Sequence, residues 1–248
     1  MPTVSTHLLP RLIGGTSLTN STCVIIDVLR ASTTIIHALG NGALGVIPCR
    51  SIEEAVSAAD RFPASERVLG GERHGKLIDG FDLDNSPFRY GPENVRDKMV
   101  VFTTTNGTRA LTECRSASTI LIGAFVNLSA LVWRLQNQTQ DLHLVCAGTD
   151  GNLTAEDILF AGAVIRKLLD RPGSNWKSGN VQTDLALDYY SARSRTPELF
   201  QQAFTESLGA QNLLELGMDA DIDRCQQRDL FECVPLFDAK TGVLHTAV

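Results

Sequence analysis

Short apolar runs rich in valine and isoleucine alternate with segments of helical periodicity, and this alternation constrains the fold more than any other feature. Runs of this length bounded by polar turns are typical of buried strands. Alternation of strands and helices favours a mainly parallel or mixed sheet that carries helices on both faces. Strands are expected at 22–28, 44–48, 67–70, 98–103, 119–122 and 142–147.

Capping residues mark the expected helix starts. Ser51 and Glu54 have the spacing of a capping box, and Asn127, Thr154 and Thr196 precede further segments of helical periodicity. The last third of the chain changes character: after a loop at 170–180, helices are expected near 181–192, 197–206 and 209–216. With no repeat or linker in 248 residues, we expect one domain over 1–248 with a helical C-terminal region.

The charge and the cysteine content of the chain limit the kinds of molecule that it is expected to bind and the compartment in which it is expected to occur. The net charge is −6 and no Lys/Arg-rich run occurs, which argues against binding to nucleic acid or to an anionic membrane. The N-terminal residues lack the features of a signal peptide, and the six cysteines form no C-x-x-C pair. We therefore expect a cytoplasmic protein with reduced thiols and a small-molecule ligand. A homodimer is the default expectation for its assembly.

The first chemically informative segment follows the strand expected at 22–28. Asp27 stands at the strand's end, Arg30 comes three residues later, and Ser32 and Thr33 lie at the start of a helix. Hydroxyls, an arginine and the free N–H groups of a helix start all donate to anions. A carboxylate in this position could bind a divalent metal or act as a nucleophile.

Three more polar segments follow other expected strands. One carries Glu72, Arg73 and Lys76, and a second continues from Thr104 to Arg109. A third begins at Gly148 and reaches two adjacent carboxylates at Glu156 and Asp157. Because a parallel sheet gathers its carboxyl ends at one rim, we expect these segments to meet there. Such a site suits phosphoryl transfer with a divalent metal.

Common phosphatase motifs do not account for these segments. Cys23 and Arg30 are one residue too far apart for a cysteine phosphatase, and Leu29 replaces the second aspartate of the D-x-D motif of haloacid dehalogenases. Arg73–Gly75 has the letters of a histidine phosphatase motif, but in the middle of the chain. That class stays open only as a minor alternative.

Taken in order, the segments resemble the 2-phosphosulfolactate phosphatase family, known from coenzyme M biosynthesis. The resemblance rests on blocks at 27–34, 71–87, 104–108 and 146–157, with a weaker match at 217–225, and it covers roughly 20–235. Asp84 departs from the small residue expected before Asn85. The resemblance implies a three-layer α/β/α fold and magnesium-dependent hydrolysis of (R)-2-phospho-3-sulfolactate to sulfolactate and phosphate.

Roles for individual residues follow from the segments and the resemblance together. Catalytic roles are expected for Asp27, Arg30 and Arg73, and Mg²⁺ ligands are expected to be Asp27, Glu72 and Asp157. The substrate-binding residues are expected to be Ser32, Thr33, Thr104, Thr105, Asn106, Gly107, Thr108 and Gly148. Lys76 and Arg109 are further candidate cations for a highly charged substrate.

Two questions stay open at this point. Asp27 could form a phospho-aspartyl intermediate or help a metal-activated water to attack the phosphate. The chain could also be a non-catalytic protein that binds small anions, or a phosphatase for a different phosphorylated hydroxy acid. Carboxylates next to the arginines favour the enzyme, because a pure anion receptor has no use for them.

Overall fold

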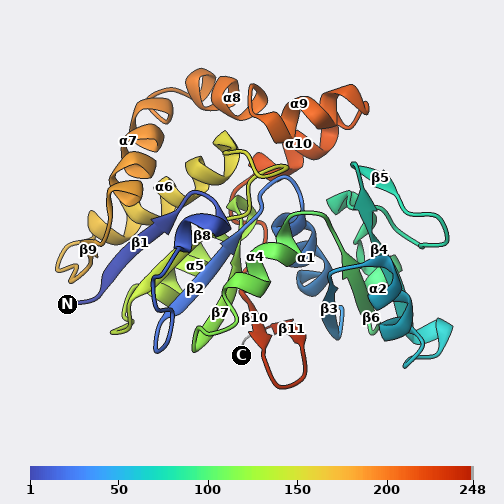
Figure 1. The fold of residues 1–248 in the computed structure, drawn as a ribbon. Coiled ribbons are helices and arrows are strands. Elements are labelled where there is room, and N and C mark those ends of the chain that lie inside the picture. The colour runs from blue at the N-terminus through green and yellow to red at the C-terminus, as the bar shows by residue number, and fades with distance from the viewer. Residues whose placement is uncertain (247–248) are drawn as a thin grey trace.

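A computed structural model describes residues 1–246 and contains a mixed sheet of eleven strands with helices packed against it (Figure 1). The strands are β1 (Thr3–His7), β2 (Thr22–Ile26), β3 (Gly45–Cys49), β4 (Arg67–Arg73), β5 (Lys76–Leu77), β6 (Met99–Thr103), β7 (Thr119–Gly123), β8 (Leu142–Cys146), β9 (Lys177–Ser178), β10 (Pro235–Asp238) and β11 (Val243–Thr246). All six strands expected from the sequence are confirmed.

The helices also agree well with the expected segments. They are α1 (Ala31–Gly40), α2 (Ile52–Ala59), α3 (Pro92–Val95), α4 (Gly107–Glu113), α5 (Leu128–Leu135), α6 (Ala155–Leu169), α7 (Val181–Arg193), α8 (Pro197–Thr205), α9 (Leu208–Glu215) and α10 (Asp219–Gln226). Ser51 and Thr196 cap α2 and α8 as expected, since their hydroxyls accept from the N–H groups of Glu54 and Leu199. None of the described helices is long and apolar enough to cross a membrane.

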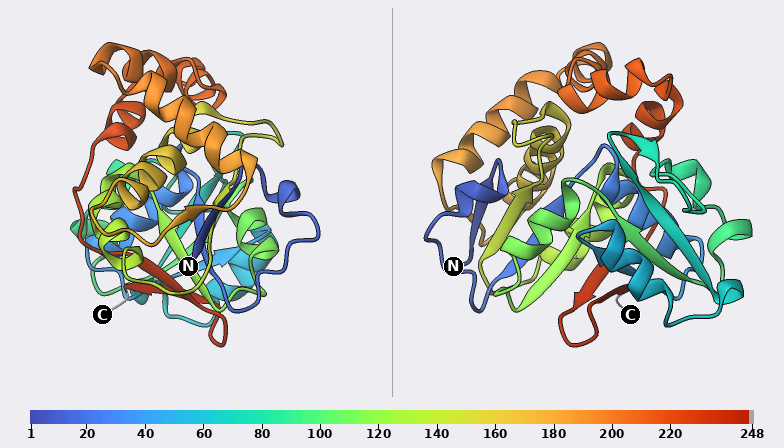
Figure 2. Two further views of the ribbon diagram at one scale, coloured as in Figure 1. Left: turned by 90° about the vertical axis from the view of Figure 1, so that its left-hand side faces the viewer. Right: turned by 45° about the vertical axis from the view of Figure 1, so that its right-hand side comes forward.

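The sheet consists of two parallel sets of strands joined by a hairpin. Strands β4, β6 and β3 pair in parallel, and so do β7, β2, β8 and β1. The hairpin β10–β11 lies between the sets and pairs antiparallel with β7 on one side and β3 on the other. The expectation of a mainly parallel or mixed sheet is confirmed as a mixed one, twisted strongly from end to end (Figure 2).

Both faces of the sheet are covered by apolar cores. Along β2, Val24 and Ile26 belong to the core under α5 and α6, whereas Cys23 and Ile25 belong to the core under α1 and α4. All four side chains are almost fully buried. A central strand that is apolar on both faces requires two covering layers, and this produces the three-layer arrangement.

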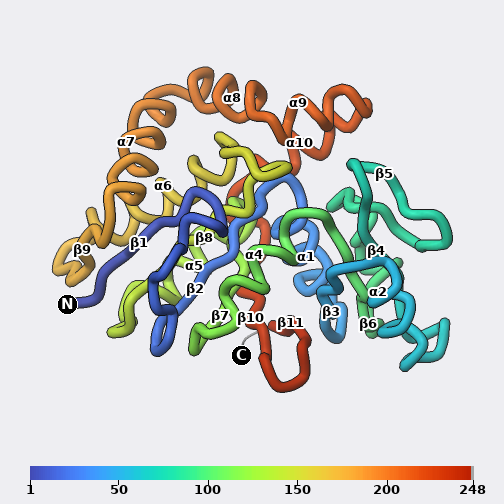
Figure 3. Tube along the Cα trace, viewed as in Figure 1, coloured from blue at the N-terminus to red at the C-terminus, as the bar shows by residue number. Residues whose placement is uncertain are grey.

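The C-terminal helices α7 to α10 form an arm that returns across the molecule from the side of β1 towards β5 (Figures 1 and 3). The loop at 170–180 lies away from this arm, at the edge of the sheet. Within the loop, β9 pairs with Thr3 and Val4 at the start of β1. The start of β1 is the end opposite the carboxyl rim. The arm, not this loop, therefore approaches the rim where the polar turns lie.

Candidate active site

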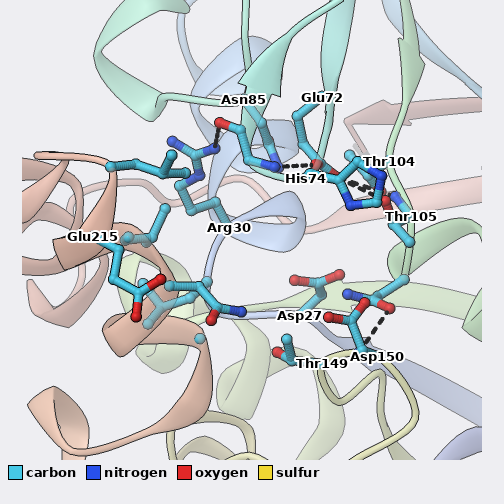
Figure 4. A pocket seen from close by; sticks show the side chains of 17 residues that line it. Asp27, Arg30, Glu72, His74, Asn85, Thr104, Thr105, Thr149, Asp150 and Glu215 are labelled. Atoms are coloured by element: carbon cyan, nitrogen blue, oxygen red, sulfur yellow. Dashed lines mark hydrogen bonds between the residues drawn. The ribbon is translucent and has the colours of Figure 1, made fainter.

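A cavity of about 310 Å³ opens where the turns after β2, β4, β6 and β8 meet (Figure 4). The convergence of the four polar segments expected from the sequence is thus confirmed, and α9 closes the cavity from above. The lining residues are Asp27, Leu29, Arg30, Glu72, His74, Gly75, Asn85, Thr104, Thr105, Asn106, Thr149, Asp150, Gly209, Asn212, Leu213, Glu215 and Leu216.

Asp27 lies at the floor of this cavity, and its side chain is 7% exposed. The hydroxyl of Ser32 accepts from the Asp27 backbone N–H at 3.0 Å, which fixes the turn after β2. Oδ1 accepts only a long hydrogen bond, 3.3 Å, from the Ala31 N–H. Gly107 approaches so closely that a Cβ atom there would lie 3.1 Å from Asp27 Oδ2. A glycine at this position therefore leaves the carboxylate room.

Burial and mutual repulsion raise the pKa of two neighbouring carboxyls. Burial raises the pKa of Asp27 to about 8, and the charge of Asp157 adds to the effect. Burial also raises the pKa of Asp157 to about 8, with a contribution from Glu156. The two oxygens of Asp157 accept from the N–H groups of Val28 and Gly148 at 2.9 and 3.0 Å. These donors favour the charged form of Asp157, so Asp27 is the partner that holds a proton near neutral pH.

Arg30 is the one guanidinium that lines the cavity in the described part of the chain. Its Nη1 forms a 2.6 Å ion pair with Asp221 of α10, and both side chains are nearly fully buried. Its Nη2 donates to the carbonyl oxygen of Gly75. Ser86 donates to the other oxygen of Asp221 at 2.6 Å. The turn after β2, the loop at 80–87 and the helical arm are therefore linked by a single carboxylate.

Glu72 joins two of the turns that line the cavity. One oxygen accepts from the Gly75 N–H at 2.8 Å, and the other accepts from the N–H and hydroxyl of Thr105 at 3.0 and 3.2 Å. The carboxylate is 8% exposed. It holds the β4–β5 hairpin against the turn after β6 and also faces the cavity (Figure 4).

The expected substrate-binding residues divide into two groups. Thr104, Thr105 and Asn106 line the cavity. Outside the lining, Thr33 donates to the Val28 carbonyl and Thr108 to that of Thr104. Three more of them also lie behind the lining. The Ser32 hydroxyl accepts from the Asp27 backbone N–H, Gly107 leaves space for the Asp27 carboxylate, and the Gly148 N–H donates to Asp157.

The expected cationic residues also divide into one that lines the cavity, Arg30, and others that lie outside the lining. Arg73 lies outside the cavity lining, where it donates to the carbonyl of Glu72 and the hydroxyl of Thr103. Lys76 and Arg109 are exposed and also stand outside the lining. Of the expected metal ligands, Asp27 and Glu72 face the cavity, whereas both oxygens of Asp157 accept from backbone N–H groups behind it. The catalytic, substrate-binding and metal-ligand roles of all the expected residues, those that line the cavity included, stay predictions.

Sequence reasoning missed the residues that α9 and α10 contribute. Asn212, Glu215 and Leu216 close the cavity, and Asp221 holds Arg30. Nothing in the pattern of a surface-like helix marks the first three as site residues. Asp221 lies in the weaker block of the family resemblance at 217–225. The resemblance therefore offered a reason to consider it as a site residue, whereas no motif did.

The donor set of the cavity suits a hard cation. Carboxylates of Asp27, Glu72, Asp150 and Glu215 stand beside amide and hydroxyl oxygens, and oxygen ligands are those that Mg²⁺ prefers. No three His, Cys, Asp or Glu side chains come close enough within 1–246 to form a complete metal cage. Mg²⁺ in enzymes commonly uses one or two carboxylates together with waters and substrate phosphate, and that arrangement fits the residues present.

An α/β fold that gathers buried carboxylates, hydroxyls and a guanidinium in one polar cavity has the features expected of an enzyme active site. Comparison with known proteins makes the class specific. The family model described as 2-phosphosulpholactate phosphatase matches residues 7–240. The chain therefore belongs to the 2-phosphosulfolactate phosphatase family, which confirms the resemblance and assigns the chain to the phosphoric monoester hydrolases.

Individual relatives agree with the family assignment. A protein of Caldanaerobacter subterraneus subsp. tengcongensis is 36% identical over 235 residues, which cover 95% of this chain and 94% of the relative. A Thermotoga petrophila protein is 41% identical over 215 residues, covering 86% and 88%. A Symbiobacterium thermophilum protein is 38% identical over 229 residues, covering 92% and 95%. Each is named "Probable 2-phosphosulfolactate phosphatase".

Proposed function

We propose that this protein hydrolyses the phosphate ester of (R)-2-phospho-3-sulfolactate to sulfolactate and phosphate in a reaction that requires Mg²⁺. The observation that carries the proposal is the placement of Asp27 at the floor of the shared cavity, where Oδ1 accepts only one long hydrogen bond. Family membership supplies the substrate class, since the relatives are named for this ester.

The charge of the cavity supports the requirement for a cation. The substrate carries phosphate, sulfonate and carboxylate groups, yet Asp27, Glu72, Asp150 and Glu215 line the site opposite a single guanidinium. Asp221 already neutralises that guanidinium. Asp27 and Glu72 would hold Mg²⁺. When bound, the ion would polarise the phosphoryl group and offset the charge that develops on its oxygens.

The protein's own groups prepare the reaction around Asp27. The Ser32 hydroxyl accepts from the Asp27 backbone N–H and so holds the turn that carries the carboxylate. Thr104, Thr105 and Asn106 present hydroxyl, amide and backbone donors from the turn after β6, where they would orient an anionic group. The charged Asp27 would attack the phosphorus, so that the ester P–O bond breaks, the sulfolactate oxygen leaves and takes up a proton, and water then hydrolyses the aspartyl phosphate. Alternatively it would orient a water that attacks the phosphorus directly with the same leaving group. An acid-quenched single-turnover reaction separates the two routes, because only the first leaves phosphate attached to residue 27.

The decisive experiment is an assay of phosphate release. Racemic phosphosulfolactate and phospholactate are compared as substrates, with Mg²⁺ and with a chelator. We expect release that depends on Mg²⁺ and strongly prefers the sulfonated ester. Release from phospholactate alone would point to another phosphorylated hydroxy acid. Metal-independent binding of the esters without release from either would favour the anion-binding protein and contradict the proposal.

A further inference from the structure

A second cavity, of about 330 Å³, shares no lining residue with the candidate active site. It lies where the end of β3 and the β10–β11 hairpin are bordered by α2 and by the turn after α4. These strands are seen between the two helices in Figure 1. A cavity of this size is typical of sites for small organic ligands.

The floor of the second cavity is apolar. Ile47 belongs to the core under α2 and Phe237 to the core under α1 and α4, so the floor lies where the two cores meet. Ile47 is 7% exposed, Phe237 is 9% exposed and Cys49 is 1% exposed, yet all three border the cavity. Apolar surface of this kind stabilises a ligand with an apolar body, because their contact removes both surfaces from water.

Two arginines stand at the exposed rim of the second cavity. Arg61 follows α2 and Arg115 follows α4. Among residues 1–246, neither guanidinium forms an ion pair. Arg61 is held in place, because its Nε donates to the Ala58 carbonyl at 3.3 Å and its guanidinium lies 5.6 Å from the centre of the Phe62 ring. The rim therefore offers guanidinium groups whose charge no carboxylate of the described chain neutralises directly.

The charge of Arg61 also acts on the floor. Burial raises the pKa of the Cys49 thiol to about 12, the charge of Glu54 adds to this increase, and the charge of Arg61 opposes it. Both charged groups therefore lie near the thiol. Glu54 accepts from the Arg50 N–H at 2.8 Å, which ties its carboxylate to the turn before α2. Two guanidinium groups against this one carboxylate give the second cavity a positive charge, in a chain whose net charge is −6.

We propose that the second cavity binds a small amphipathic anion, whose apolar body packs on the floor and whose single oxyanion group pairs with Arg61 and Arg115. Sulfonate, carboxylate and phosphate groups all offer the oxygens that a guanidinium binds through parallel N–H bonds. The apolar floor distinguishes such a ligand from a small inorganic anion, which would have no group to place there. The site does not depend on the function proposed above, because the two cavities have separate linings.

The first test uses 8-anilino-1-naphthalenesulfonate, a fluorescent probe with an aromatic body and one sulfonate. The protein is titrated with the probe in the presence of Mg²⁺ and excess 3-sulfolactate, which is intended to occupy the active site. We expect one saturable site per chain. Arg61→Gln and Arg115→Gln should each weaken binding roughly three- to tenfold, between the effects of an exposed and of a buried charged contact.

Arg50→Gln is the matched control, because Arg50 is an exposed arginine beside the same helix but outside the lining of the second cavity. This variant should bind the probe as tightly as wild type does. Ala58→Leu narrows the second cavity without changing its charge, so it should also weaken binding. Melting temperatures close to that of wild type show that each variant is folded.

The second test is competition at constant ionic strength. p-Toluenesulfonate, which has an aromatic body, should displace the probe, and sulfate at the same concentration should not. Binding that 3-sulfolactate abolishes, or that is equally tight in Arg61→Gln, Arg115→Gln and wild type, would place the probe elsewhere and overturn the proposal. Binding that does not saturate, or equal displacement by sulfate, would overturn it as well, since either would indicate general attraction to the surface and not a built site.

Discussion

At the scale of single residues, hydrogen-bond donors distinguish two buried carboxyls, only one of which faces the cavity. Asp27 and Asp157 both have pKa values raised to about 8 by burial. Two short backbone N–H bonds commit Asp157 to holding the turns after β2 and β8 together. Asp27 has one long bond and faces the cavity. The same chemical group therefore serves architecture in one place and is free for chemistry in the other.

Asp27→Asn tests the catalytic role. The amide keeps the size of the carboxyl and can still accept from the Ala31 N–H, so the fold should remain and the melting temperature should not fall. Loss of a catalytic carboxylate should lower kcat by roughly 100- to 10,000-fold. Asp79→Asn, an exposed change outside the cavity, is the control. An Asp27→Asn enzyme that retained most of its phosphate release would show that another group carries the reaction.

The raised pKa of Asp27 also predicts how metal activation depends on pH. Because the folded-state pKa of about 8 exceeds the ordinary value of 3.8, the folded protein without metal holds a proton that the unfolded chain has lost. The stability from this proton is complete below pH 4 and is lost as pH rises through 8. A cation bound at Asp27 must displace the proton.

The Mg²⁺ concentration for half-maximal activity should therefore rise as pH falls from 8 to 6, by up to about tenfold per pH unit. The increase in melting temperature caused by Mg²⁺ should shrink over the same interval. Activation titrations and thermal unfolding at three pH values measure both. A half-maximal concentration that did not change with pH would mean that Mg²⁺ binds away from the protonated carboxyl.

Sequence reasoning found the residues whose position follows from a strand and missed those that depend on tertiary contacts. Asp27, Glu72 and Thr104 each lie at or just after a buried strand's end, so their convergence could be predicted. Whether a cation such as Arg73 faces the cavity depends on its rotamer and neighbours. The ion pair that Arg30 forms with Asp221 is likewise invisible until the helical arm is placed beside the turn after β2.

At the scale of elements, the ion pair between Arg30 and Asp221 attaches the helical arm to the sheet. Both side chains are almost fully buried, so neither charge can recover its hydration if the partner is removed. Asp221→Asn should lower the free energy of unfolding by about 3–5 kcal/mol. Urea unfolding followed by circular dichroism measures the change.

The exposed pair Arg166–Asp170 offers a control of the same chemistry. Its side chains are 43% and 60% exposed and lie one turn apart on α6 and at its end. Asp170→Asn should change the free energy of unfolding by about 0.5 kcal/mol or less. Similar small losses in the two variants would show that the arm is held by apolar packing and not by Asp221.

Helix boundaries were predictable because caps and apolar periodicity are local signals, as Ser51 and Thr196 illustrate. The hairpin β10–β11 was not predicted, and the C-terminal region was expected to be helical. Its strands are four residues each, and Pro235 opens the first. Such short strands carry little pattern of their own. They form because β7 and β3 offer open edges on either side.

At the scale of the whole molecule, this hairpin joins the two strand sets that carry the two halves of the site. Asp27 and Thr149 come from the strand set of β2 and β8, and Glu72 and Thr104 come from that of β4 and β6. The hairpin is the connection within the sheet between the sets. The hairpin contributes no residue to the lining of the cavity, so we expect any effect of it on the site to act through the alignment of the two strand sets.

Leu244 tests this view, because its side chain is 1% exposed in the core shared by α1 and the sheet, and it pairs with Val46 of β3. Leu244→Ala removes buried methyl groups and leaves a cavity, which should cost about 2–5 kcal/mol of unfolding free energy. His245→Ala, one residue along on the less buried face, should cost far less. If the hairpin aligns the two sets, Leu244→Ala should also raise KM at temperatures where the variant remains folded. A variant that lost stability but kept the KM of wild type would show that the arm, and not the hairpin, aligns the two halves of the site.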